Sequence, residues 1–155
     1  MSFGYELLNV LRGEHCKGLN VDCFSIEEEL PEPTSLPKAY IINSERADSS
    51  TGNLGHWVAL YVSRDRSVIY FDSYGLMLSP IYEKVLAWGS KYHPFVYNKK
   101  IIQDFTSNAC GAHCVAFVYF MFMQVPLDKF LSFYSDNLKE NDKLAFSVYK
   151  TLRNG

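Results

Sequence analysis

The sequence has little of what marks a secreted, membrane-bound or nucleic-acid-binding protein. Its 155 residues carry a formal net charge of -2, so no basic excess points to nucleic acid or to an anionic membrane. The first residues contain neither the basic region nor the long apolar core of a secretory signal. The apolar run 109–123 contains His113 and falls short of the roughly 20 residues that cross a bilayer. We therefore expect a chain that is not secreted and that has neither a membrane nor a nucleic-acid partner.

Cysteine is also scarce, with four residues at positions 16, 23, 110 and 114. In a chain without a secretory signal, so few thiols indicate reactivity or packing and not a disulfide framework. Structural zinc sites typically pair ligands about two to four residues apart. Cys16 and Cys23 are separated by six residues, and Cys110 and Cys114 have no second close pair. We expect no metal, and a zinc-binding interaction module is kept as an alternative.

The sequence is rich in apolar residues, with 48% hydrophobic and 15% aromatic side chains. This composition and length predict one packed domain over residues 1–155. Short β-like runs alternate with helical patterns, which predicts an α+β fold with a central, mostly antiparallel sheet and helices packed on it. The expected strands are 39–42, 56–62, 67–72 and 95–98, and the expected helices are 6–11, 79–92, 108–123 and 141–152. Residues 27–37 and 44–55 are expected to be loops.

Cys110 has the sequence context of a nucleophile. A polar approach, 103–108, precedes it, and an apolar run follows it, which places it at the N-terminus of a buried core helix. Free helix-end N–H groups and a nearby protonated histidine both favour a thiolate, the reactive form of cysteine. Gly111 directly after it removes a side chain where a substrate backbone would approach. Cys114, one helical turn further on, is expected to be a small core residue.

His56 and Asp72 can be brought together by a β-hairpin. Residues that face each other in an antiparallel hairpin have position numbers with a constant sum, and a three-residue loop 63–65 would place these two directly opposite. Asp65 would then take the left-handed conformation that such loops need. Opposed Cβ atoms lie about 4.5–5.5 Å apart, so the carboxylate can orient one imidazole nitrogen while the other faces a thiol.

Three segments carry a family resemblance: Gly55-His56-Trp57, then Tyr70-Phe71-Asp72-Ser73, then Gln103 followed by Ala109-Cys110-Gly111. Their order and spacing resemble the adenain-like cysteine proteases, a clan that includes the adenovirus maturation protease and the proteases of ubiquitin-like modifiers. The resemblance implies catalytic roles for His56, Asp72 and Cys110. It also implies that the Gln103 side chain contributes to an oxyanion hole. Trp57 and Gly111 would form the walls of a narrow substrate cleft.

The resemblance further implies a thiol endopeptidase, of a virus or mobile element, that matures capsid or other precursor proteins at glycine-containing sites. Its partner would be a polypeptide with small residues near the scissile bond, cut by a monomer in the host cytoplasm or nucleus or inside a virion. We expect no cofactor; the family's peptide activator is left open, while the slight acidity of this chain argues against its DNA activator. The alternatives are a ubiquitin- or SUMO-directed protease, an acetyltransferase on the same scaffold, and a catalytically silent scaffold.

Overall fold

The computed structural model describes residues 4–44, 55–75 and 80–155. The strands are β1 (Asn20–Ser25), β2 (Lys38–Asn43), β3 (Trp57–Val62), β4 (Val68–Phe71) and β5 (Phe95–Tyr97). The α-helices are α1 (Gly4–Leu11), α2 (Pro80–Gly89), α3 (Cys110–Phe122), α4 (Leu127–Leu131) and α5 (Leu138–Asn154), and a short 3₁₀ turn, η1, spans Glu14–Cys16. None of the helices within these ranges is both long enough and apolar enough to span a membrane.

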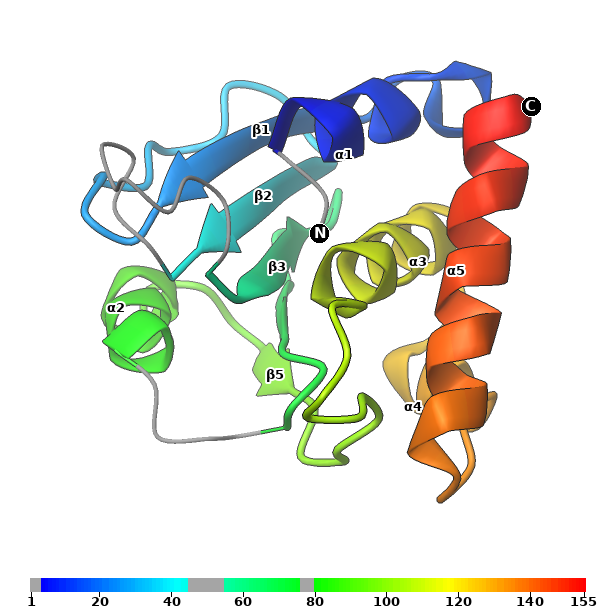
Figure 1. Cartoon of the computed structure of the whole chain (residues 1–155). Coiled ribbons are helices and arrows are strands. Elements are labelled where there is room, and N and C mark those ends of the chain that lie inside the picture. The colour runs from blue at the N-terminus through cyan, green and yellow to red at the C-terminus, as the bar shows by residue number, and fades with distance from the viewer. Residues whose placement is uncertain (1–3, 45–54, 76–79) are drawn as a thin grey trace.

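The five strands form one sheet in the order β1-β2-β3-β4-β5 (Figure 1). The three central strands, β2, β3 and β4, pair antiparallel with one another, whereas the edge strands β1 and β5 pair in parallel with β2 and β4. Helix α3 lies against β3, and α1 and α5 pack on α3 from outside. The predicted α+β fold, with helices on a central sheet and Cys110 at the start of a buried helix, is confirmed.

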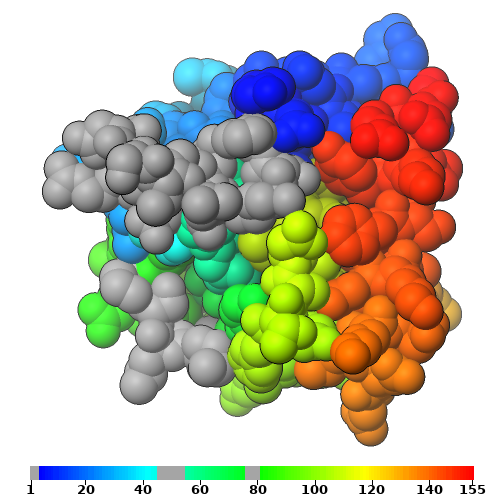
Figure 2. All heavy atoms as spheres, viewed as in Figure 1, coloured from blue at the N-terminus to red at the C-terminus, as the bar shows by residue number. Residues whose placement is uncertain are grey.

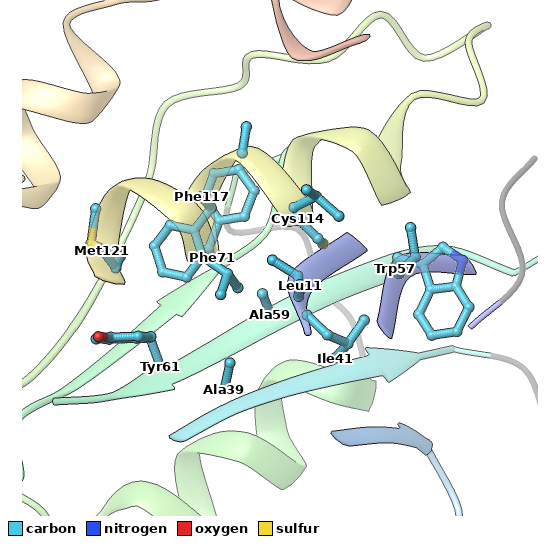
Figure 3. Close-up of a cluster of buried hydrophobic side chains, with 14 of the residues drawn as sticks. Leu11, Ala39, Ile41, Trp57, Ala59, Tyr61, Phe71, Cys114, Phe117 and Met121 are labelled. Carbon is cyan, nitrogen blue, oxygen red and sulfur yellow. The ribbon is translucent and has the colours of Figure 1, made fainter. Parts of the chain in front are cut away.

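Strand β3 reads as a continuous apolar run because both faces of the sheet are covered. Its odd-numbered residues, such as Ala59, belong to a core shared with α1, α3 and α5. Its even-numbered residues, such as Leu60, belong to a second core that includes Ile81 and Val85 of α2. Figure 3 shows the first core between α3 and the sheet, where the rings of Phe71 and Phe117 stack 4.7 Å apart.

The β3–β4 hairpin has the predicted loop size but is displaced by one residue. Ala59 pairs with Phe71 and Val62 pairs with Val68, so that paired positions add to 130 and not to 128. The loop is Arg64–Arg66, closed by a hydrogen bond of 3.0 Å from the Ser63 N–H to the Ser67 carbonyl, and Arg66 takes the left-handed conformation at φ 69°. Asp65 instead accepts from the backbone N–H of Ser67 at 3.0 Å. The predicted left-handed Asp65 is therefore wrong.

Strand β1 and helix α4 were not predicted from the sequence. β1 is an edge strand with only two buried positions, Val21 and Ser25, so it lacks the apolar signal of β2 and β3. Its first residue, Asn20, uses its side chain to accept a hydrogen bond of 3.1 Å from the buried Lys38 ammonium. Polar pairing between neighbouring strands, invisible in a single-strand pattern, therefore replaces apolar alternation here.

The turn that follows β4 requires glycine at its last position. Residues Asp72–Gly75 form a β-turn closed by a hydrogen bond of 2.8 Å from the Gly75 N–H to the Asp72 carbonyl. Gly75 has φ 71°, and a Cβ on it would lie 2.6 Å from the backbone oxygen of Lys99. Gly18 also has a positive φ, of 97°, but a Cβ there would meet nothing within 4 Å. The chain therefore supplies a matched pair of glycines, one in a confined position and one in an open position.

Gly75→Ala should destabilise the protein more than Gly18→Ala. Both substitutions force alanine into the left-handed region at a cost of about 1–2 kcal/mol. Only Gly75→Ala must also move the 99–101 backbone, and we expect it to lower the free energy of unfolding by about 3 kcal/mol or more. Urea unfolding of the two variants measures the difference. Equal losses would show that the backbone at Lys99 moves aside freely.

Candidate active site

Cys110 is the first residue of α3. Its side chain is buried, with 4% of the residue exposed. The residue before it, Ala109, caps the helix without any side-chain hydrogen bond. The free N–H groups of the first turn therefore point toward the region in front of the thiol, where they favour negative charge.

His56 and Asp72 lie at the adjacent ends of β3 and β4 and touch each other. His56 Nε2 is 2.6 Å from Asp72 Oδ1. The side chain of Asp72 is 4% exposed and that of His56 is 21% exposed, so the imidazole is the accessible member of the pair. Cys110 is, with Asp72, one of the two groups that raise the pKa of His56, so the thiol lies close to the imidazole; because Nε2 is engaged by Asp72, the nitrogen left for the thiol is Nδ1. The structure thus brings these three predicted site residues together.

The two side chains share one face of the hairpin, as predicted, but they are not directly opposite each other. The observed pairing ends at Ala59 and Phe71, and its register, extended along the chain, would set position 74 opposite position 56, so Asp72 meets the imidazole from the turn that follows β4. The predicted direct opposition is wrong because the loop is centred one residue later than expected. Parity is preserved, since a shift of the sum by two leaves every side chain on its original face.

The electrostatic surroundings raise the pKa of His56 to about 9. Burial alone would lower the pKa, because it penalises the charged imidazolium. The hydrogen bonds from His56 to Asp72 and Cys110, together with the negative charges of these two groups, outweigh burial. His56 is therefore protonated at neutral pH and carries a proton that it can donate.

Asp72 is held by two residues that the sequence did not single out. The side chain of Asn98, itself 1% exposed, accepts from the Asp72 N–H at 2.9 Å and donates to the Asp72 carbonyl at 2.6 Å. The Asn98 amide thus makes the two backbone hydrogen bonds that a neighbouring strand would make at the point where β4 ends. The backbone N–H of Tyr74 donates to Asp72 Oδ1 at 2.9 Å, the same oxygen that meets His56. No local pattern signals Asn98, which is 26 residues away in the chain.

Gln103 is fully buried between the turn after β4 and the start of α3. Its backbone N–H donates to the Ser73 carbonyl at 3.2 Å, and one end of its amide meets the Ser73 hydroxyl. The other end faces the helix start. As a nitrogen, this end donates to the Ser107 carbonyl at 3.3 Å. As an oxygen, it accepts from the backbone N–H of Cys110 at 3.2 Å and of Ala109 at 3.3 Å. In both orientations the amide lies beside the candidate nucleophile.

The two residues predicted as cleft walls lie in different surroundings. Gly111 is buried as the second residue of α3. Trp57 is only 2% exposed, belongs to the core shared with α3, and a Cβ on Gly4 would be 3.3 Å from its ring (Figure 3). The indole is thus a packing residue in this structure, and its direct contact with a substrate stays a prediction.

The other three cysteines are unreactive by their surroundings. Burial raises the pKa of Cys16 to about 11 and that of Cys23 to about 12. Burial also raises the pKa of Cys114 well above its usual range. Each of these thiols therefore stays protonated at neutral pH. Within residues 4–44, 55–75 and 80–155, no group of three or more His, Cys, Asp and Glu side chains is arranged to hold a metal ion.

A second histidine–aspartate pair anchors α3 to α5. His113 Nε2 lies 2.8 Å from Asp142 Oδ1, with His113 fully buried. His113 follows Cys110 by three residues, so the pair fixes the first turn of α3 against α5. Asp142 is 29 residues further along the chain, so no local pattern signals this link between the helices.

A sizeable cavity of the described part lies away from this site. Its volume is about 710 Å³, and it lies between the Arg64–Arg66 loop and the C-terminal end of α3, where Met121 and Phe122 line it. Cys110 is at the opposite end of the same helix. Cavity size and reactive chemistry therefore point to different places, and the chemistry identifies the candidate site.

No protein-family model matches the chain, and no curated protein matches it by sequence. Solved structures do match its fold. The ASFV pS273R protease superposes with a TM-score of 0.59 at 14% identity over 92% of this chain. ChlaDub1 from Chlamydia trachomatis, and the Chlamydia trachomatis effector protein Cdu1 bound to ubiquitin, each superpose with a TM-score of 0.56 at 19% identity over 96% of this chain.

The chain is shorter than these proteins. It spans 64% of the length of the pS273R structure and 74% of the ChlaDub1 and Cdu1 structures. At these identities the likeness concerns the backbone fold. The chain therefore shares its fold with a protease and with a protein that was captured on ubiquitin.

Proposed function

We propose that the chain is a cysteine peptidase in which Cys110 is the nucleophile, His56 the acid–base group and Asp72 the residue that orients it. The observation that carries this proposal is the imidazole of His56, which is hydrogen-bonded on Nε2 to Asp72 at 2.6 Å and lies close enough to Cys110 for the thiol to raise its pKa. A nucleophile, a base and an orienting group in hydrogen-bonded sequence are what acyl transfer to a thiol requires. The similar fold of the ASFV protease supports the same activity.

The proposed reaction uses each group once in each half. The Cys110 thiolate attacks the scissile carbonyl carbon, and the electrons of the C=O bond move to oxygen. The C–N bond then breaks as the His56 imidazolium gives its proton to the leaving amine, which leaves a thioester on Cys110. Water attacks the thioester and loses a proton to His56, and the carboxylic acid product departs from the regenerated thiolate–imidazolium pair.

The oxyanion formed in both halves needs donors near Cys110. The Cys110 N–H and the Gln103 side-chain amide are adjacent, and the nitrogen orientation of that amide presents both as donors. The oxygen orientation instead occupies the Cys110 N–H. The surrounding donors and acceptors favour the oxygen orientation, because it satisfies both ends of the amide. We infer that the amide turns to its nitrogen orientation when the oxyanion forms, because two donors aimed at a developing oxyanion stabilise it and one missing donor typically costs about 10²–10³ in rate.

Two substrate classes follow from the likenesses. A viral precursor polypeptide would suit an adenain-like role, which the likeness to the ASFV protease supports. A ubiquitin-like modifier is the second class, and the Cdu1 structure bound to ubiquitin favours it. Both classes are polypeptides that would approach Cys110 from the side on which His56 is exposed.

Substitution of Cys110 should abolish both thiol reactivity and peptide turnover. Cys110→Ala should lose iodoacetamide labelling at pH 7, because the pKa values of Cys16, Cys23 and Cys114 keep those thiols protonated. Mass spectrometry of the modified cysteines measures this, with Cys23→Ala as the matched control that should label like the wild type. Turnover of a peptide library and reaction with ubiquitin that bears a C-terminal electrophile test the activity. Activity retained by folded Cys110→Ala would refute the proposal.

The pH profile should report the raised pKa of His56. Because that pKa is about 9, the imidazolium that donates the proton persists well above neutrality, and kcat/KM should fall only as the pH rises through about 9. Asp72→Asn removes the negative charge of Asp72, one of the causes that raise the pKa of His56. Its alkaline limb should therefore move to lower pH, with a reduced rate and some residual activity. An unmoved limb would show that Asp72 does not act through His56.

Glycine near the scissile bond should be preferred if the cleft is narrow. Matched peptides with glycine or valine at the residue before the cut, or one position further back, should differ in kcat/KM by on the order of 10²-fold, because a branched side chain misplaces the carbonyl. Trp57→Ala should reduce this ratio only if the indole reaches the cleft. Equal values for the two peptides at both positions would show an open cleft.

A further inference from the structure

The imidazole of His56 and two aromatic rings, those of Tyr74 and Phe105, stack in series toward the surface. The imidazole stacks on the ring of Tyr74 with centroids 4.4 Å apart and planes 17° apart. Tyr74 in turn stacks on Phe105 at 4.9 Å and 24°. Phe105 is 55% exposed, although aromatic side chains of its size usually seek burial. The peptidase mechanism above makes no use of Tyr74 or Phe105.

The two outer rings come from segments that already carry the site. Tyr74 belongs to the turn after β4, and its backbone N–H donates to the same Asp72 oxygen that meets His56. Phe105 belongs to the segment between Gln103 and Cys110, which reaches the surface beside α5 (Figure 2). Asp104 fixes that segment by accepting from the Thr106 N–H at 3.0 Å and from its hydroxyl at 2.9 Å.

The stacked rings restrain tilting of the imidazole out of its own plane, which in-plane contacts at its nitrogens do not restrain. Contacts at Nε2 and Nδ1 both lie in the imidazole plane, so they leave the ring free to swing about the line that joins its two nitrogens. A ring packed on one face blocks that motion. An aromatic face within about 6 Å also attracts a cation, and His56 is cationic at neutral pH.

Among the described residues, the groups that act directly on His56 and Tyr74 are acidic, and the cationic Lys139 of α5 acts in turn on Asp104. His56 faces Asp72 and Cys110, and the Tyr74 ring feels Cys110, Asp142, Asp72 and Asp104. These groups come from the turn after β4, the segment before α3, α3 itself and α5. All of them are acidic, so the interactions that these groups make with His56 favour its charged form.

We propose that Tyr74 and Phe105 are positioning residues for His56: Tyr74 supports one face of the imidazolium, and Phe105 holds Tyr74 in place. This inference rests on the proposed function, because it concerns the acid–base group of that reaction. The segment that connects Gln103 to Cys110 is thereby coupled to the histidine through ring contacts as well as through the thiol.

The test is an NMR titration of the His56 ring in the full chain, with the other three histidines as internal references. Tyr74→Leu should lower the titration midpoint by about 0.5–1 pH unit, because leucine offers no π face to the cation. Tyr74→Phe keeps an aromatic ring on the imidazole, so its midpoint should lie closer to the wild-type value than to that of Tyr74→Leu. Phe146→Leu, which alters another exposed aromatic, on α5, is the matched control and should not change the midpoint. A midpoint in Tyr74→Leu equal to the wild-type value would overturn the proposal.

Phe105→Leu keeps the test decisive if Tyr74→Leu fails to fold, since Phe105 is exposed. We expect a shift in the same direction but smaller than for Tyr74, together with a lower rate of iodoacetamide reaction at Cys110. An unchanged midpoint in Phe105→Leu would mean that the ring contacts substrate or solvent and does not position His56. The titration midpoint is measured without any turnover. If the peptidase proposal fails, the wild-type and variant midpoints will still differ as expected here, but the wild-type protein will cleave no substrate.

Discussion

The narrow reversal of the chain after β4 is the constraint on which the candidate site depends. The turn Asp72–Gly75 closes only because Gly75 takes a positive φ against the Lys99 carbonyl. Each of its first three residues then has a separate task. Asp72 meets His56, the Ser73 carbonyl accepts from the backbone N–H groups of Ile102 and Gln103, and the Tyr74 ring covers His56. A shift of this turn would move the acid, the histidine support and the Gln103 segment together.

The chemical identity of the site could be predicted from the sequence because it depends on residue types and order. His56, Asp72 and Cys110 lie together in the structure, and the hairpin arithmetic placed the first two on the correct face. The register itself was wrong by one loop position. Whether the left-handed residue is Asp65 or Arg66 depends on the Asp65 carboxylate, which accepts from the Ser67 N–H, and both choices fit the strand pattern equally well.

The supporting residues could not be predicted, for a different physical reason. Asn98 replaces a strand at the end of β4, and Phe105 stacks on a ring 31 positions earlier in the chain. Contacts of this kind depend on how distant segments meet and leave no periodic signal in either segment. Strand β1 escaped detection for a related reason, since the apolar alternation that reveals a strand is largely absent from a half-polar edge. Local patterns thus predict the secondary structure and the reactive residues, whereas the long-range polar and ring contacts that support the site become visible only in the structure.

The four candidate catalytic residues, from His56 to Cys110, lie in one continuous stretch of the sequence that ends at the start of α3. The segments outside that stretch supply packing: α1 and α5 press on α3, and β1 and β2 extend the sheet. The stretch that holds the candidate catalytic residues is therefore distinct in sequence from the elements that pack around it. Extra length can be added before β1 or after α3 while the reacting atoms keep their places, as long as the contacts on α3 survive. Homologous chains of quite different size could therefore share this chemistry and differ in which polypeptides they admit.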